Sequence, residues 1–325
     1  IYIIYMVDDC DKSFNQSGFI YPLQWFPGYI FRNIRFGMER VMHPVEKSIP
    51  FRMKSLKDHD VIFLGDVMGI NNTDLIVGDS LKNLLKKSKY IVINLEAPLC
   101  ERCNAIQTFL PVPVPSFVIW KEEFVRVMKV LDITFDKLIV NIANNHSFDA
   151  GEDSLNDTIQ ILKDLKCTII GSQTYSFTNI ENTYIIGTTL RMNPSTKKQS
   201  KYLVQPDDVD KIVESFPKNA YVIVFVHWGW EYYEKPDEQS VNCAKKLTKC
   251  NNVKLIVGHG PHLLQETHTI NKNICVYSLG DFLVRSKRPV KTSNPRSLNG
   301  LLKLSLIEKN LEMIPLIQNH SKHKT

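Results

Sequence analysis

The sequence lacks the long apolar run of a membrane-spanning helix. Such a helix needs about 20 consecutive, mostly apolar residues, and the apolar opening of the chain, residues 1–6, is far shorter. This opening also lacks the basic segment and the small-residue cleavage site of a secretory signal peptide. Because the first residue is Ile and not Met, the opening is also compatible with a natural start further upstream.

The sequence also lacks the cysteine spacing of a disulfide framework. Its seven cysteines are an odd number, which favours reduced thiols in a reducing compartment. Cys100 and Cys103 form a single C-x-x-C pair without the second pair that a structural zinc site needs. We therefore interpret them as incidental loop cysteines and expect a cytoplasmic or peripheral membrane protein.

No strong charge of one sign, internal repeat or low-complexity tract is present. The net charge of +6 is spread along 325 residues, so it suits an anionic substrate or partner but gives no reason to expect nucleic acid binding. With 43% hydrophobic residues, the chain is able to bury one large core or two smaller ones.

Residues 1–57 differ from the rest of the chain. They are aromatic and basic, and residues 29–48 have a basic amphipathic pattern. We favour an arm that packs on the main domain; the alternative is a contact between 29–48 and a membrane surface or a synthase complex. Residues 58–320 are expected to form the main domain, with 321–325 as a tail.

From residue 60 onward, strand patterns alternate with helix patterns. Continuous apolar runs are typical of strands buried on both faces; they occupy residues 61–64, 90–93, 137–140, 221–226 and 253–257. Helical spacing of apolar residues predicts helices around 81–85, 120–131, 155–165 and 206–215, and Trp120 is expected in the core stripe of the second. Residues 300–307 and 311–317 predict a hairpin.

Each of these apolar strands stops at residues that are able to bind metal ions. In an α/β protein, the carboxyl ends of parallel strands meet at the edge of the sheet where ligands bind. One such residue alone is explained as a cap, a turn or a core histidine, but the coincidence at five strands favours a common site. Carboxylate, amide and imidazole ligands suit Mn²⁺, Fe²⁺ or Zn²⁺, and six ligands suit two divalent ions bridged by a carboxylate. The six candidate ligands are Asp66, Glu96, Asn145, His227, His259 and His262, and His146 directly follows Asn145.

The motifs around these residues resemble, in wording and order, the CapA family of poly-γ-glutamate and capsule biosynthesis proteins, which is related in fold to calcineurin-like metallophosphoesterases. The resemblance covers about residues 59 to 320 and implies a four-layer α/β/β/α sandwich of two mixed sheets. Members of the CapA family are often anchored in the membrane, with the domain facing outward. The matching motifs are Gly65-Asp66-Val67-Met68, Asn94-Leu95-Glu96, Ala143-Asn144-Asn145-His146 with Asp149 and Gly151, His227-Trp228-Gly229 with Glu231-Tyr232, Gly258-His259-Gly260-Pro261-His262, and Tyr277-Ser278-Leu279-Gly280-Asp281-Phe282.

The resemblance also implies roles for individual residues. Asp66 and His262 would bind the first metal, Glu96 would take the position of a bridging carboxylate, and Asn145, His227 and His259 would bind the second. His146 would transfer protons or support the ligands, held by Asp149. The sequence departs from ordinary phosphoesterases where Met68 replaces a histidine ligand and Glu96 replaces an aspartate, and from the family where Asp281 replaces a frequent Asn.

These expectations lead to a metal-dependent hydrolase or transferase that acts on an amide- or phosphate-containing anionic polymer or its precursor. Glu231 would orient water or bind a substrate amine, or form a surface salt bridge, and Asn144, Trp228 and Tyr232 would line the pocket. One alternative is a peptide epimerase in which His146 or Glu231 removes an α-proton. The other is a non-catalytic component of polymer assembly or export that keeps the site for binding.

Overall fold

The computed structural model describes residues 2–7, 60–69, 74–101, 117–284 and 298–321. The basic segment 29–48 and Cys103 lie outside these ranges. No helix among the described residues is long and apolar enough to cross a membrane.

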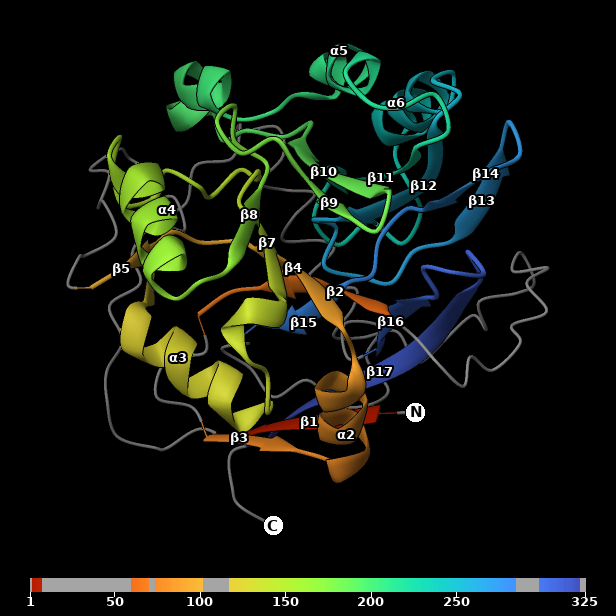
Figure 1. Cartoon of the computed structure of the whole chain (residues 1–325). Helices are drawn as coiled ribbons and strands as arrows, with labels where there is room; N and C mark the ends of the chain where they lie inside the picture. Colours follow the sequence, from red (N-terminus) through yellow and green to blue (C-terminus); the bar gives the residue numbers. More distant parts are fainter. Residues whose placement is uncertain (1, 8–59, 70–73, 102–116, 285–297, 322–325) are drawn as a thin grey trace.

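The described strands form two mixed sheets, as predicted (Figure 1). In the larger, nine-stranded sheet, β2, β4, β7 and β8 run parallel, and β16 and β17 form the predicted antiparallel hairpin. Its strands, in spatial order, are β3 (Asp74–Val77), β1 (Tyr2–Val7), β17 (Leu311–Ser321), β16 (Leu298–Leu304), β2 (Val61–Val67), β4 (Tyr90–Leu95), β7 (Leu138–Asn141) and β8 (Thr168–Ile170), with β15 (Asp281–Leu283) also paired to β2.

The smaller sheet has six strands, with four central parallel strands and an antiparallel strand at each edge. Its strands, in spatial order, are β13 (Thr267–Ile270), β14 (Asn273–Val276), β12 (Val253–His259), β11 (Tyr221–His227), β10 (Thr183–Thr189) and β9 (Phe177–Ile180). A separate short pair is formed by β5 (Leu99–Cys100) and β6 (Ile119–Trp120).

Helices connect the parallel strands and cover the outer faces of both sheets. Their apolar residues recur every three or four positions, so each helix buries one face. The α-helices are α2 (Asp79–Lys87), α3 (Lys121–Val130), α4 (Ser154–Asp164), α5 (Val209–Glu214) and α6 (Glu238–Leu247), and the 3-10 helices are η1 (Phe135–Lys137), η2 (Pro194–Tyr202) and η3 (Pro206–Asp208).

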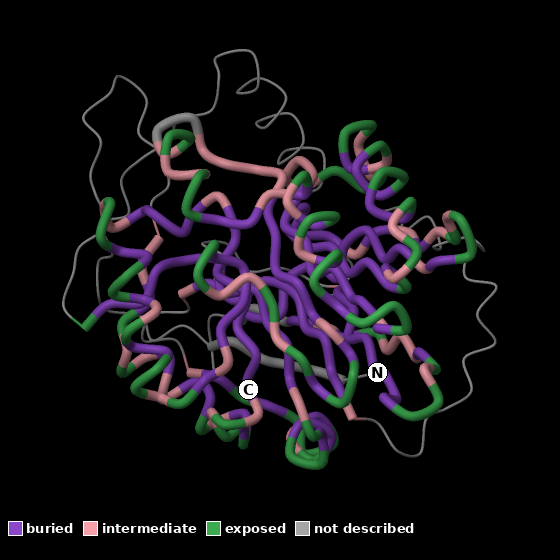
Figure 2. Tube along the Cα trace, turned by 45° about the horizontal axis from the view of Figure 1, so that its top comes forward, coloured by how far each residue is buried: buried purple, intermediate pink, exposed green. Residues whose placement is uncertain are grey.

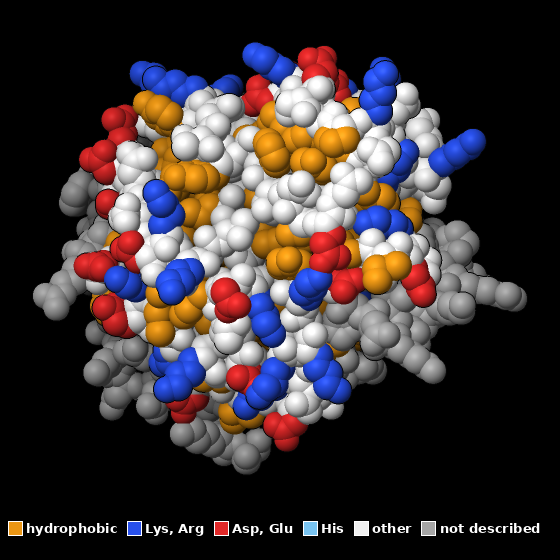
Figure 3. Space-filling view, viewed as in Figure 1, with side chains coloured by type: hydrophobic (Ala, Val, Ile, Leu, Met, Phe, Trp, Pro, Cys, Tyr) orange, Lys and Arg blue, Asp and Glu red, His pale blue; other side chains and the backbone are white. Residues whose placement is uncertain are grey.

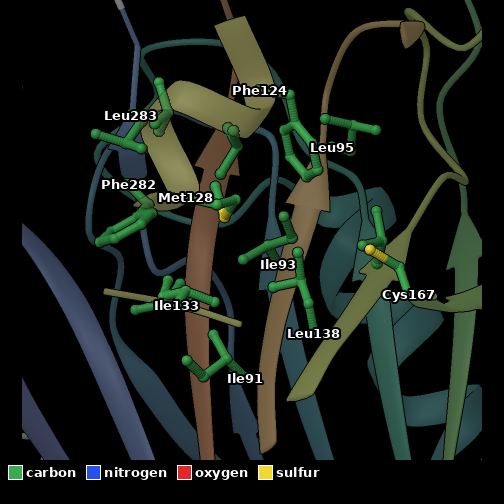
Figure 4. Close-up of a cluster of buried hydrophobic side chains, with 14 of the residues drawn as sticks. Ile91, Ile93, Leu95, Phe124, Met128, Ile133, Leu138, Cys167, Phe282 and Leu283 are labelled. Carbon is green, nitrogen blue, oxygen red and sulfur yellow. The ribbon is translucent and has the colours of Figure 1, made fainter. Parts of the chain in front are cut away.

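Three buried clusters define the order of the layers. One lies between α2, α3, α4 and the larger sheet (Figure 4), a second between the two sheets, and a third between the smaller sheet and α5 with α6. The strands that carry these clusters are buried along most of their length (Figure 2). The polypeptide therefore packs as helices, sheet, sheet and helices.

Two details differ from the expectations. Trp120 was expected in the core stripe of α3, but it precedes the helix and is 53% exposed, whereas Phe124 and Met128 are buried as predicted. The cysteines were expected to be reduced; Cys167, Cys243, Cys250 and Cys275 are free, but Cys100 is disulfide-bonded. In addition, β1 pairs with β3 and β17, so the larger sheet includes residues from the N-terminal segment.

Candidate metal centre

The site lies where the inter-sheet core ends at the carboxyl edges of the parallel strands. Side chains alternate between the two faces of a strand. In β11 and β12, Phe225 and Val257 belong to the inter-sheet core, so His227 and His259, two positions further on, face the same space. The two strands are in register here, with His227 paired with His259.

A local irregularity turns Asp66 toward the same space. Phe63 faces the other sheet and Leu64 faces the helices, so strict alternation would turn Asp66 toward the helices. However, Phe63 pairs with Val92 and Asp66 with Asn94, which leaves one extra residue in β2. Such a bulge re-aims the side chains that follow it, and here it brings Asp66 to the histidines of the smaller sheet.

The close approach of β15 to β2 requires glycine at position 65. A Cβ atom there would lie 1.8 Å from the carbonyl oxygen of Gly280. The Asp66 N–H donates to this same oxygen at 3.1 Å. The glycine therefore fixes the position of the backbone from which Asp66 projects.

Two overlapping groups of buried side chains have the arrangement of metal ligands. Asp66, His227 and His259 form one group, Asp66, Glu96 and His262 form the other, and the ligand atoms of each lie within 4.8 Å of one another. His259 Nδ1 lies 3.3 Å from Asp66 Oδ1, and His262 Nδ1 lies 3.4 Å from Asp66 Oδ2. Asp66 is thus the residue common to both groups, whereas the motif resemblance gave the bridging position to Glu96.

Glu96 lies between two histidines. Its Oε1 is 3.6 Å from His227 Nε2 and 3.8 Å from His262 Nε2. On the other side of the His262 ring, Nδ1 is 2.7 Å from Asp281 Oδ1. Asp281 therefore orients His262, as residues that hydrogen-bond a metal-ligating histidine commonly do.

A ladder of buried asparagines supports Asp66; of its members only Asn144 was predicted at the site, as a pocket residue. Asn94 donates to Asp66 Oδ1 at 2.7 Å and accepts hydrogen bonds from Asn141 at 3.0 Å and Asn144 at 3.4 Å. Asn144 also donates to the Leu95 carbonyl at 2.8 Å. Asn144 is completely buried, so it holds the strands together and does not line an open pocket.

The electrostatic environment fixes the protonation states of the first group. Burial alone would raise the pKa of Asp66, but hydrogen bonds and charge from His259 and His262 hold that pKa well below its usual range. Burial lowers the pKa of His259 and, together with the neighbouring His259 ring, lowers the pKa of His227 well below its usual range. At neutral pH, Asp66 is therefore ionised and both histidines are neutral, which is what metal ligation requires.

In the second group, the pKa values of Glu96 and His262 are both raised. Burial and the Asp66 charge raise the pKa of Glu96 well above its usual range. Burial alone would lower the pKa of His262, but the carboxylates of Glu96 and Asp281 raise it well above its usual range. A divalent cation favours the ionised carboxylate and the neutral imidazole, so binding there would release protons.

The buried polar atoms of the site test whether the residues fit metal ions. Glu96 Oε2, His259 Nε2 and Asn145 Oδ1 are buried and have no hydrogen-bond partner among the described residues. An unpaired buried polar atom costs about 1–3 kcal/mol, so unpaired atoms on candidate ligand residues are expected where a bound ion supplies the missing partner. Carboxylate oxygens, an imidazole nitrogen and an amide oxygen together are a donor set that suits divalent cations of intermediate softness.

His146 and Asp149 form a buried pair beside the ligands. His146 Nδ1 lies 2.7 Å from Asp149 Oδ2, and the same oxygen accepts the Phe117 N–H at 2.9 Å. Asn145 directs its amide nitrogen to Asn193 Oδ1 at 3.3 Å. His146 is thus held through Nδ1, and Nε2 is the ring nitrogen that does not contact Asp149.

Of the remaining residues predicted at the site, Tyr232 and Glu231 belong to the loop that reaches His262, whereas Trp228 lies in the outer core. Tyr232 is half-buried, its ring centroid lies 5.8 Å from that of His262, and Glu231 precedes it in the same loop. Trp228 is completely buried in the outer core and donates to the Tyr277 carbonyl at 2.8 Å. Because neighbouring residues of a strand face opposite ways, Trp228 points away from the ligand groups and does not line a pocket with them.

Residues 59–286 match the family of the bacterial capsule synthesis protein PGA_cap, and this range contains all of the ligand groups. The chain belongs to this family. Two curated relatives agree: the PGA biosynthesis protein CapA of Bacillus subtilis (strain 168) is 25% identical over 245 residues, or 68% of this chain, and the capsule biosynthesis protein CapA of Bacillus anthracis is 29% identical over 220 residues, or 61% of this chain.

The matches leave part of each relative uncovered. The PGA_cap chain spans 62% of the Bacillus subtilis protein and 51% of the Bacillus anthracis protein. A solved crystal structure aligns with 78% of this chain at 11% identity and a TM-score of 0.42, a similarity too weak to indicate function.

Proposed function

We propose that this PGA_cap chain is a metal-dependent hydrolase or transferase that acts in the synthesis or processing of poly-γ-glutamate or another capsule-type anionic polymer. The observation that carries the proposal is the pair of buried ligand groups that share Asp66. The names of the two relatives, which refer to PGA and capsule biosynthesis, support the substrate class.

Each of the two ligand groups would hold one divalent ion. Asp66, His227 and His259 would hold one divalent ion, and Asp66, Glu96 and His262 a second, with Asn145 available through its unpaired Oδ1. Bound ions would supply Lewis-acid polarisation of a carbonyl or phosphoryl oxygen and would activate water. Mn²⁺, Fe²⁺ and Zn²⁺ all suit this donor set.

Side chains of the protein would act as general acid or base and would orient the reacting groups. His146, with Nδ1 fixed by Asp149, is placed to take or give a proton at Nε2. Tyr232 lies beside His262, and Glu231 precedes Tyr232 in the loop after β11; these two residues would orient water or a substrate amine.

The experiment compares turnover in His227→Ala and His268→Ala. His268 lies in β13 of the same sheet and is partly exposed, so it controls for the loss of an imidazole. We would incubate Mn²⁺-loaded protein with poly-γ-glutamate and with a panel of phosphoesters, and follow chain length and phosphate release. The proposal expects turnover that is lost in His227→Ala and kept in His268→Ala.

Other outcomes would indicate the alternatives. Deuterium from the solvent at an α-carbon, without bond cleavage, would indicate an epimerase. Stable metal binding without turnover of any substrate would indicate a role in polymer assembly or export, and equal turnover in both variants would contradict the assigned site.

A further inference from the structure

The segment that connects β10 to η3 is basic. Residues 191–205 contain four basic residues and no acidic one, whereas positive and negative side chains are interspersed over much of the face in Figure 3. Lys197, Lys198 and Lys201 are exposed, and basic side chains gather at the upper left of Figure 3, where Figure 1 shows η2 in green.

We propose that Lys197, Lys198 and Lys201, the η2 lysines, form a binding surface for an acidic polymer chain and present that chain to the metal centre. This inference rests on the proposed function, because it identifies the part of the molecule that would recognise a polycarboxylate substrate.

Within the described part of the chain, no ion pair neutralises the η2 lysines, and the carboxylate that reaches this helix, Glu152, accepts a hydrogen bond from Gln199 at 3.0 Å. The nearest carboxylates in sequence are already engaged, since Asp207 pairs with Lys246 at 2.7 Å and Asp208 accepts the Gln205 N–H at 2.8 Å. Three positive charges are therefore available to an external anion.

The fourth basic residue of the segment is occupied. Arg191 lies over the Trp230 ring at 3.7 Å, donates to the Gly229 carbonyl at 3.1 Å and pairs with Asp237 at 3.3 Å. It therefore holds the loop after β11 in place, and we assign it no part in polymer binding.

The spacing of the lysines follows from the helix type. A 3-10 helix has three residues per turn and a rise of about 2 Å per residue, so residues i and i+3 lie on the same side about 6 Å apart. Lys198 and Lys201 have this relationship within η2, and Lys197 precedes Lys198 by one residue. Such a row suits carboxylates that recur along a flexible chain.

The helix that carries the η2 lysines contacts the segment that carries Asn145 and His146. Asn193, at the start of η2, accepts a hydrogen bond from Asn145 at 3.3 Å. At the end of η2, the Tyr202 ring lies 6.3 Å from that of Phe148, two residues beyond His146. A polymer bound to η2 would thus lie on the helix that contacts Asn145, whose Oδ1 is buried and has no hydrogen-bond partner among the described residues.

Aromatic content favours a polycarboxylate over nucleic acid. Surfaces that bind single strands stack bases on several aromatic side chains. Tyr202 is the only aromatic residue of 191–205, and its ring already lies 5.0 Å from Lys201 Nζ.

The test compares two triple variants of the full chain. Lys197, Lys198 and Lys201 are changed to Gln in one, and the exposed Lys211, Lys218 and Lys249 near α5 and α6 in the other. Binding of a fluorescently labelled poly-γ-glutamate oligomer is measured by anisotropy at low and high salt. The η2 variant is expected to lose about tenfold in affinity, from three exposed ion pairs, and the control variant about twofold or less.

An additional variant and two competing ligands distinguish a failure of this inference from a failure of the proposed function. Asp66→Asn removes a metal ligand and is expected to leave polymer affinity unchanged, so polymer binding without turnover would leave the surface standing when the proposed function fails. Equal losses in the two triple variants would overturn the inference. So would binding of duplex DNA or of anionic phosphatidylserine vesicles through the η2 lysines with higher affinity than poly-γ-glutamate.

Discussion

His227 and His259 occupy paired positions at the ends of β11 and β12, and their Nδ1 atoms lie 3.0 Å apart. Two protonated imidazoles would repel each other at this distance. Burial lowers the pKa of both rings, so the smaller sheet offers two neutral imidazoles to the carboxylates of the larger one. The site therefore exists only where the two sheets meet.

Asn94→Ala should weaken metal binding without removing a ligand. Asn94 holds one oxygen of Asp66 at 2.7 Å, and loss of a group that orients a ligand typically costs about 10–100-fold in affinity. Titration of metal-free protein with Zn²⁺ or Mn²⁺ measures this effect. Asn252→Ala, which removes an exposed amide, is the control, and equal affinity in the two variants would contradict the assigned role.

Asp281→Asn should lower the pKa of His262 in metal-free protein. The carboxylate of Asp281, 2.7 Å from His262 Nδ1, is one of the charges that raise this pKa. A neutral amide removes that charge, so the ring should release its proton at a lower pH than in the wild type. NMR titration of the histidine ring signals measures the shift; an unchanged or higher pKa would show that Asp281 does not control His262.

Gly65→Ala should strongly destabilise the fold. Its Cβ would lie 1.8 Å from the Gly280 carbonyl oxygen, which belongs to the backbone and is unable to move aside alone. We expect a loss of at least about 3 kcal/mol in the free energy of unfolding, as for severe overpacking. Gly78→Ala is the control, because Gly78 is exposed and has φ −64°, which alanine adopts with a change within about 1 kcal/mol. Similar denaturant midpoints would refute the close approach.

The buried thiols should react slowly in the native protein. Burial raises the pKa of Cys167 and of Cys243 to about 12, so very little thiolate is present at pH 8. Cys250 is only partly buried. Alkylation at pH 8 followed by mass spectrometry should label Cys250 before Cys167 and Cys243, and rapid labelling of Cys167 or Cys243 would contradict the packing.

The strand ends were predictable from the sequence, but the faces of the strands were not. Apolar runs such as 221–226 are buried on both sides, so their pattern does not show which face meets the other sheet. Alternation does show that Trp228 points away from its neighbour His227, a relationship that the motif comparison overlooked. Asn94 and Asn141, each a polar residue within a buried strand, were the available signal for the supporting ladder.

Other features depend on tertiary structure. The face of Asp66 is set by the extra residue of β2, which appears only in the register with β4. The role of Asp66 as the shared ligand depends on distances between two sheets, and such distances are not encoded in the spacing of motifs.

The most direct test of the account is elemental analysis of purified protein after reconstitution with Mn²⁺ or Zn²⁺, for the wild type, Asp66→Asn and Asp207→Asn. Asp207 is 81% exposed and pairs with Lys246, so it controls for the same chemical change at the surface. Because Asp66 belongs to both ligand groups, we predict two divalent ions per chain in the wild type and in Asp207→Asn, and loss at both positions in Asp66→Asn. A wild type without metal, or an Asp66→Asn variant that retains both ions, would contradict the shared centre.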